Sequence, residues 1–165
     1  RTRFLVDIIK NEFQLNPDQQ MMILAHNKSL IKELYDSIIL FEDSVGFYLG
    51  GMKEHLLKES ETKKIIIATY AMASEGLDIK TLTTLVMATP KSDVCQSVGR
   101  ILRSKHSTPL VIDIVDPHTI FYNQYKKRNK YYSKKQYSVE TFLNSNHYFR
   151  NKQIEKKIKP CLLKL

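Results

Sequence analysis

Hydrophobic positions along this chain switch between the spacing of helices and the continuous runs of buried strands. Apolar residues recur every three or four positions from Leu5 to Phe13, which predicts a helix over residues 2–13. Residues 21–25 are apolar on both faces, as is typical of a strand buried in a parallel sheet. Asn27 follows this strand, and we expect it to cap a helix over residues 30–39.

The same alternation continues along the chain. Further strands are expected at residues 45–49, 64–69, 85–88 and 110–115, and further helices at residues 52–60, 93–103 and 118–132. Three successive isoleucines in residues 64–69 require burial on both sides. Strands that alternate with helices at short intervals predict an α/β fold with a mostly parallel sheet and helices on both faces.

The pattern weakens after residue 136. One more helix is expected over residues 139–149, and the last residues combine basic side chains with isolated apolar ones. We therefore expect one domain over residues 1–135 and an extension over residues 136–165, whose structure the sequence leaves open.

Polar and glycine residues follow several of the predicted strands. Ligands of parallel α/β sheets collect at the carboxyl ends of the strands. Residues at these ends are His26, Asn27, Lys28, Gly50, Gly51 and Thr69. One edge of the sheet is therefore predicted to be polar and available to a ligand.

Composition narrows the class of protein. The 165 residues fit one domain, and 42% hydrophobic with 26% charged residues is typical of a soluble globular protein. No apolar run approaches the ~20 residues that span a bilayer. The first residues do not resemble a signal peptide. An intracellular setting without membrane contact is expected, and a chain that starts at Arg1 is expected to be part of a longer protein.

A metal site is not expected. The two cysteines, Cys95 and Cys161, are too few for a disulfide framework. Neither has a Cys or His neighbour at the spacing of zinc ligands, and the five histidines are scattered.

A formal net charge of +9 favours polyanions as partners. Basic and aromatic residues alternate within residues 126–137, where lysines could neutralise phosphates while tyrosines stack on bases. The basic candidates are Lys126, Lys127, Arg128 and Lys130. A solvated basic helix whose tyrosines pack inward is the alternative interpretation.

Two arginines, Arg100 and Arg103, are three residues apart, so a helix would place both on one face with Gln96 one turn earlier. Guanidinium groups bind phosphate well because they are always charged and offer a planar fork of donors. Gly99 precedes Arg100 and would let a ligand approach closely, although glycine within a helix costs about 1 kcal/mol. A solvated helix face is the alternative for the arginine pair taken alone.

Residues 75–78 form an acidic turn after the isoleucine strand. Gly76 could expose its backbone N–H, and Asp78 offers a carboxylate to sugar hydroxyls, as acidic residues do in nucleotide sites. A tight structural turn in which Asp78 acts as a cap is equally compatible with the pattern.

Taken together and in this order, these stretches resemble the second RecA-like domain of superfamily 2 helicases. Residues 23–28 resemble the fourth helicase motif, residues 69–78 the fifth and residues 96–103 the sixth. Ser97 departs from the arginine that is common at its place in the sixth motif, whereas Gln96, Gly99 and both arginines match. The branch most similar to this chain is that of the transcript-release helicases of large DNA viruses and their phage and repair relatives.

The resemblance implies a RecA-like three-layer sandwich that uses ATP with Mg²⁺. Arg100 and Arg103 would be arginine fingers, which are worth ~10³ to 10⁵ in rate in such enzymes, with Gln96 near the phosphates. Gly76, Asp78 and Gly99 would contribute to nucleotide binding. His26, Asn27, Gly50, Gly51 and Thr69, with Lys28, would hold a DNA or RNA backbone without reading its bases.

The resemblance also indicates what is absent. No glycine is followed by lysine anywhere in the sequence, so there is no phosphate-binding Walker A loop, and no acidic quartet of the helicase Walker B type is present. ATP would therefore be bound mainly by an N-terminal RecA-like domain of the same polypeptide, and the isolated chain is expected to be inactive. The alternative function is a non-catalytic nucleic-acid-binding domain with a helicase-like fold.

Overall fold

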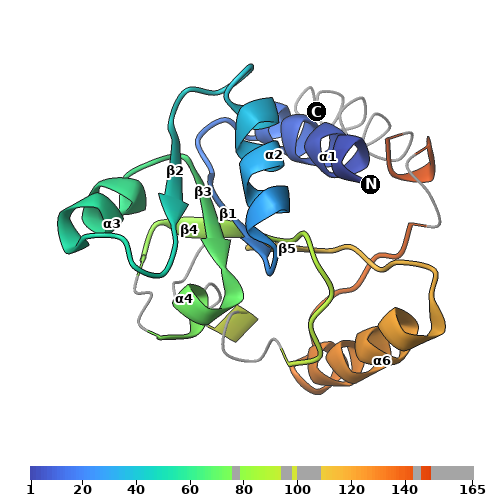
Figure 1. Cartoon of the computed structure of the whole chain (residues 1–165). Helices are drawn as coiled ribbons and strands as arrows, with labels where there is room; N and C mark the ends of the chain where they lie inside the picture. The colour runs from blue at the N-terminus through green and yellow to red at the C-terminus, as the bar shows by residue number, and fades with distance from the viewer. Residues whose placement is uncertain (76–78, 94–97, 100–108, 143–145, 150–165) are drawn as a thin grey trace, which may run out of the picture. The chain divides into compact units, whose positions relative to one another are not determined.

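A computed structural model describes residues 1–75, 79–93, 98–99, 109–142 and 146–149. The chain divides into two compact units, Arg1–Tyr131 and Tyr132–Leu165. The described part of the first unit holds a five-stranded parallel sheet with the strand order β2-β3-β1-β4-β5 (Figure 1).

The elements follow the predicted order. The strands are β1 (Gln20–Ala25), β2 (Val45–Tyr48), β3 (Ile65–Thr69), β4 (Leu82–Met87) and β5 (Leu110–Asp113). The helices are α1 (Thr2–Leu15), α2 (Lys28–Ile38), α3 (Glu54–Glu61), α4 (Tyr70–Glu75) and α6 (Thr119–Lys134).

Strand β1 lies at the centre of the sheet and pairs with β3 and β4. Ile23 is level with Ile67 on one side and with Val86 on the other. All six residues of β1 are buried, which explains why its sequence is apolar at consecutive positions instead of alternating.

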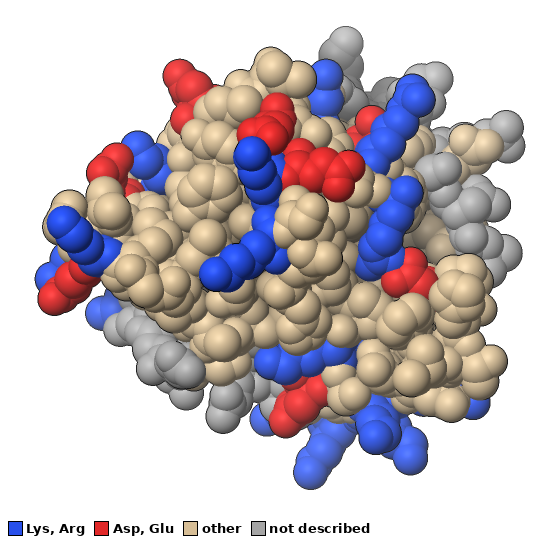
Figure 2. Space-filling view, viewed as in Figure 1, with Lys and Arg blue, Asp and Glu red and all other residues tan. Residues whose placement is uncertain are grey.

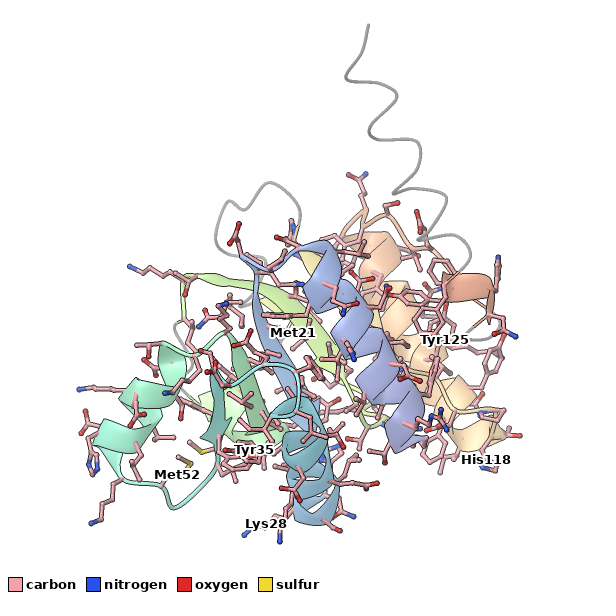
Figure 3. The ribbon with its side chains drawn as sticks, turned by 90° about the horizontal axis from the view of Figure 1, so that it is seen from above. Met21, Lys28, Tyr35, Met52, His118 and Tyr125 are labelled. Atoms are coloured by element: carbon pink, nitrogen blue, oxygen red, sulfur yellow. The ribbon has the colours of Figure 1, made fainter. Side chains whose placement is uncertain are left out.

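Helices cover both faces of the sheet. On one face, alternate strand residues such as Met21 and Ile23 share a core with Leu5 and Ile9 of α1 and Leu34 of α2. Figure 3 shows Met21 at the sheet, beside α1. The intervening strand residues point to the opposite face, which α4 adjoins through contacts with β1 and β3. The predicted layered α/β architecture is therefore confirmed.

Two sequence predictions need correction. The helix α4 begins directly after β3, where only a turn rich in small residues was expected. The prediction of one helix over residues 139–149 is wrong for residues 139–142, which are irregular, whereas residues 146–149 are helical. Phe142 packs edge-on against Tyr148 with ring centroids 5.3 Å apart, a contact that the spacing of apolar residues could not reveal. The predicted helix over residues 93–103 lies largely outside the described residues, of which Val98 and Gly99 are helical.

None of the helices within the described ranges has the length and apolar character needed to cross a membrane.

Candidate functional site

The carboxyl edge of the sheet brings His26, after β1, next to the segment that follows β4. The backbone N–H of His26 donates to Thr89 Oγ1 at 3.1 Å, and the N–H of Ala88 donates to the Leu24 carbonyl oxygen at 2.9 Å. These bonds fix the ends of two neighbouring strands at the same level. They place His26 where the sequence analysis expects a ligand.

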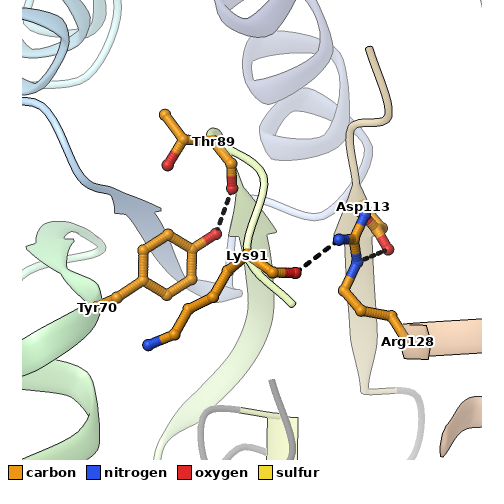
Figure 4. Close-up of polar contacts among 5 residues, drawn as sticks. All are labelled: Tyr70, Thr89, Lys91, Asp113 and Arg128. Carbon is orange, nitrogen blue, oxygen red and sulfur yellow. Dashed lines mark hydrogen bonds and ion pairs between the residues drawn. The ribbon is translucent and has the colours of Figure 1, made fainter. Parts of the chain in front are cut away.

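Tyr70, the first residue of α4, is buried at this edge of the sheet. Its ring lies 4.5 Å from the ring of His26, and Lys91 Nζ lies 4.8 Å from the centre of the tyrosine ring. The Tyr70 hydroxyl donates to the Thr89 carbonyl oxygen at 2.6 Å (Figure 4). Burial raises the pKa of Tyr70 well above its ordinary value, so the phenol remains a neutral donor.

His26 is exposed, and its environment favours the neutral imidazole. Partial burial lowers the pKa of His26, the positive charge of Lys91 lowers it further, and a hydrogen bond with the Pro90 backbone opposes both. An ammonium group and an imidazole therefore lie side by side at the strand ends. The Lys91 ammonium suits the backbone of a polyanion because it can donate to phosphate oxygens, whereas the single N–H of the neutral imidazole is engaged by the Pro90 backbone.

Asn27 and Thr69, two predicted backbone-binding residues, have structural roles. The Asn27 side-chain oxygen accepts from the Ser29 backbone N–H at 2.8 Å, which confirms its prediction as the cap of the following helix. Thr69 Oγ1 accepts from the Met72 backbone N–H at 3.4 Å. Lys28 is exposed and projects from the start of α2 (Figure 3).

Gly50 and Gly51 form the turn after β2. Gly51 has φ of 84°, a left-handed conformation that favours glycine. A Cβ added at Gly50 would lie 3.9 Å from Met72 Sδ, so this turn adjoins α4. Both glycines are exposed and offer backbone groups to a ligand beside α4.

Helix α6 has a buried stripe and a basic face. Arg128 and Tyr132 are buried, whereas Lys126, Lys127 and Lys130 are exposed. We call these three lysines the lysine face. Tyr122 belongs to the same exposed side, and Lys126 Nζ lies 4.9 Å from the centre of its ring. Phosphate binding by the lysine face stays a prediction, and the tyrosines of the helix are divided between surface and interior.

Arg128 does not belong to that face. Its side chain is 1% exposed, and its guanidinium binds Asp113 through two hydrogen bonds, from Nε to Oδ2 and from Nη2 to Oδ1, both at 2.8 Å. Its Nη1 donates to the Lys91 carbonyl oxygen at 2.6 Å (Figure 4). The expectation that Arg128 contacts nucleic acid is corrected, because no surface remains for a phosphate. An acidic residue inside the apolar run 110–115 was the signal in the sequence for this buried pair.

Acidic and basic side chains are interspersed on the face viewed in Figure 2. The excess positive charge of the chain is therefore not gathered into one patch there. Charge alone does not locate the binding surface, and the lysine face of α6 is identified from burial instead.

Most predicted nucleotide-binding residues lie outside the described part of the chain. These are Gly76, Asp78, Gln96, Arg100 and Arg103. Gly99 is described as helical and half-buried, and a Cβ placed on it would be 3.7 Å from the Tyr131 hydroxyl. This distance is an ordinary van der Waals contact, so packing against Tyr131 does not require glycine at this position. The prediction that Gly99 lets a ligand approach closely stays a prediction. The described residues contain no group of three His, Cys, Asp or Glu side chains that could hold a metal ion.

Relatives of the chain come from large DNA viruses. The chain is 40% identical over 148 residues to "Putative ATP-dependent RNA helicase L396" of Acanthamoeba polyphaga mimivirus, a match that covers 86% of this chain and 28% of the relative. It is 30% identical over 116 residues to "Putative ATP-dependent RNA helicase QP509L" of African swine fever virus, a match that covers 68% of this chain and 23% of the relative. The chain thus spans about a quarter of these relatives. No protein-family model matches it.

Solved structures share the fold. The C-terminal domain of the DEAD-box protein Dbp5 superposes with a TM-score of 0.71 at 18% identity, over 92% of this chain and 89% of that domain. UvsW of T4 superposes with a TM-score of 0.64 at 22% identity, over 86% of this chain and 35% of that chain. The five-stranded parallel sheet is therefore that of a RecA-like helicase domain, as the sequence predicts.

Proposed function

The chain belongs to the superfamily 2 helicases as their C-terminal RecA-like domain, and we propose that it is the C-terminal motor half of an ATP-dependent RNA helicase or translocase. One observation carries the proposal. The stretches that match the fourth, fifth and sixth motifs follow in order along the sequence, and the first of them ends at the carboxyl edge of the parallel sheet, beside Thr89. The names of the viral relatives support RNA as the substrate, and DNA is the alternative substrate.

In this proposal the domain completes an ATP site that another domain provides. Arg100 and Arg103 stabilise negative charge on the phosphates and Gln96 binds beside them, while Gly76, Asp78 and Gly99 meet the remainder of the nucleotide. ATP with Mg²⁺ would supply the cleavable phosphoanhydride bond. The domain's own contribution is fixed positive charge and main-chain donors.

The N-terminal RecA-like domain of the same polypeptide is the proposed partner. The viral relatives are about four times longer than the matched region, which leaves room for such a domain. The absence of a glycine followed by lysine in this sequence supports the same division, since a Walker A loop has to come from elsewhere. The polynucleotide substrate would place the protein inside a cell, in the cytoplasm, in the nucleus or at a site of viral replication.

The polynucleotide backbone would run along the carboxyl edge. His26, Lys28 and the turn of Gly50 and Gly51 offer exposed groups to it. Asn27 and Thr69 would act there through their backbones, because their side-chain oxygens already accept hydrogen bonds. The lysine face of α6 would add phosphate contacts in the domain of residues 1–135.

A non-catalytic nucleic-acid-binding domain is the second candidate, favoured by the lysine face, which needs no nucleotide. ATP turnover separates the two functions. The test compares the isolated chain with the longer polypeptide, each with and without single-stranded RNA or DNA. RNA-stimulated turnover by the longer polypeptide alone is expected. ATP turnover by the isolated chain would overturn the proposal that the ATP site is shared between two domains. Absence of ATP turnover in both the isolated chain and the longer polypeptide would favour the non-catalytic binding domain.

A further inference from the structure

Arg128 joins three parts of the domain at one guanidinium group. It originates from α6, binds the Asp113 carboxylate at the end of β5, and donates to the Lys91 carbonyl oxygen in the segment after β4. We call this set of contacts the Arg128 clamp. Figure 4 shows the arginine side chain reaching toward both partners.

The clamp is built for geometry more than for net stability. A buried ion pair often contributes no more than an apolar pair of the same volume, because its desolvation offsets the attraction. The planar guanidinium group, however, fixes the orientation of the side chain. Two parallel hydrogen bonds to a carboxylate leave the remaining guanidinium nitrogen directed at one point. Here that point is the Lys91 carbonyl oxygen, at 2.6 Å.

The two ends of the clamp adjoin different functional elements. On α6, the neighbours of Arg128 in sequence are Lys127 and, two residues on, Lys130, both exposed on the lysine face. On the other side, Lys91 precedes the stretch of sequence that contains Gln96, Arg100 and Arg103. Lys91 also approaches Tyr70, which stacks against His26.

We propose that Arg128 is a positioning residue that couples polynucleotide binding on the lysine face of α6 to the segment after β4 that leads into the sixth motif. A phosphate backbone held by the lysines restrains α6, and the clamp passes that restraint to Lys91. The inference rests on the proposed function, because it needs a polynucleotide on α6. It goes beyond that function by assigning a task to a buried residue that contacts neither ATP nor RNA.

Hydrogen exchange of the 165-residue chain tests the coupling without ATP turnover. Amide exchange in peptides that cover residues 91–99 is measured with and without oligouridylate, together with oligouridylate affinity. RNA is expected to slow this exchange at least about threefold in the wild type, because exchange reports local opening. In the double variant Arg128→Met/Asp113→Leu, which replaces the ion pair by apolar groups, affinity should stay within about twofold while the slowing disappears.

The controls separate coupling from stability. Lys32→Met, an exposed change on α2, should retain both RNA binding and the slowing of exchange. Arg128→Lys keeps a positive charge beside Asp113 but lacks the planar guanidinium group, so it should also abolish the slowing of amide exchange by RNA. If the double variant does not fold, Arg128→Lys tests the coupling in its place. In the longer polypeptide, either clamp variant should lower RNA-stimulated kcat at least about tenfold with little change in the RNA concentration for half-stimulation, as expected for misplaced catalytic groups.

The outcomes are distinct. Slowing of equal size in the wild type and in both clamp variants overturns the coupling. RNA binding that leaves residues 91–99 unchanged in the wild type also overturns it, while the proposed RNA-binding function stands. Absence of RNA binding by the wild type overturns that function and the coupling together.

Discussion

His26 and Tyr70 stack with their ring centroids 4.5 Å apart and their planes inclined by 34°. The two residues come from the ends of β1 and β3, which are neighbours in the sheet. The contact therefore holds an exposed imidazole over a buried phenol at the carboxyl edge. The third residue of this cluster is Lys91, whose Nζ lies over the ring of Tyr70.

The first prediction concerns the titration of His26. Its pKa should lie below 6.5 in the folded chain and should rise in Lys91→Met, because one of the charges that lowers it is removed. NMR titration of the imidazole C–H resonance measures this change, with the exposed Lys80→Met as the control. A His26 pKa that is the same in both variants would contradict the electrostatic link to Lys91.

The direction of the pH dependence follows from this shift. The unfolded chain binds the His26 proton more readily than the folded chain, so this group makes the free energy of unfolding rise as pH increases toward 6.5. The contribution is fully present above 6.5 and is lost as pH falls through the lowered folded pKa. His26→Gln should remove this part of the dependence.

The second prediction concerns the stability of the Arg128 pair. Arg128→Met leaves the carboxylate of Asp113, whose side chain is only 13% exposed, without the fork that neutralises it. The free energy of unfolding should fall by about 3 kcal/mol, as for other broken buried pairs. Urea denaturation measures this decrease, and Arg128→Met/Asp113→Leu should recover most of it. A decrease below about 1 kcal/mol, the value of surface pairs, would show that the pair is solvated.

The third prediction concerns the lysine face. Lys126, Lys127 and Lys130 changed together to Glu should weaken binding of single-stranded RNA and reduce the slope of log affinity against log salt, by about 0.7 for each phosphate that is no longer neutralised. Salt-titrated fluorescence anisotropy measures both quantities. The matched control changes Lys10, Lys32 and Lys53 to Glu, which alters net charge equally from exposed positions on other parts of the domain. Equal effects of the two triple variants would remove α6 from the interface.

The fourth prediction concerns the start of α2. Asn27→Ala removes the side-chain acceptor for the Ser29 N–H and should lower the free energy of unfolding by about 1 kcal/mol. Thermal or urea unfolding measures this, and Lys32→Ala on the exposed face of the same helix should have little effect. Retained stability would mean that the cap is replaced by water, and weaker RNA binding by Asn27→Ala at unchanged stability would assign the side chain to the ligand instead.

The sequence predicts most of this fold because its central strands, β1, β3 and β4, are largely buried on both faces. Residues such as Ile65 to Ile67 have no alternative to the middle of a parallel sheet, and Asn27 caps the helix it precedes. The strand order is harder to predict, since β1 is central only through long-range pairing with β3 and β4. The short helix α4 was missed because its small residues also suit a turn.

Residues of the candidate site could be predicted where their place follows from the order of strands and helices along the sequence. They could not be predicted where their place depends on tertiary packing. His26, Gly50 and Gly51 lie at strand ends, as the alternating pattern requires. Arg128 looks like its lysine neighbours in the sequence, and only the helical phase of α6 turns it inward toward Asp113. The contacts among His26, Tyr70 and Lys91 join three segments that are distant in sequence, so no local sequence pattern predicts these contacts.

The fifth prediction, on Arg100 and Arg103, concerns the central claim that this domain completes an ATP site. In the longer polypeptide, Arg100→Ala and Arg103→Ala should each lower RNA-stimulated kcat for ATP by about 10³-fold or more, since arginine fingers contribute that much to phosphoryl transfer. RNA affinity should stay within about threefold of the wild type, because phosphodiester contacts of the domain lie elsewhere.

The decisive measurement is therefore RNA-stimulated ATP turnover by these two variants, with RNA affinity measured in parallel and Lys32→Ala as the exposed control. The account predicts that turnover is abolished while RNA binding is kept. Turnover that survives in both arginine variants, or RNA binding that falls together with it, would contradict the account.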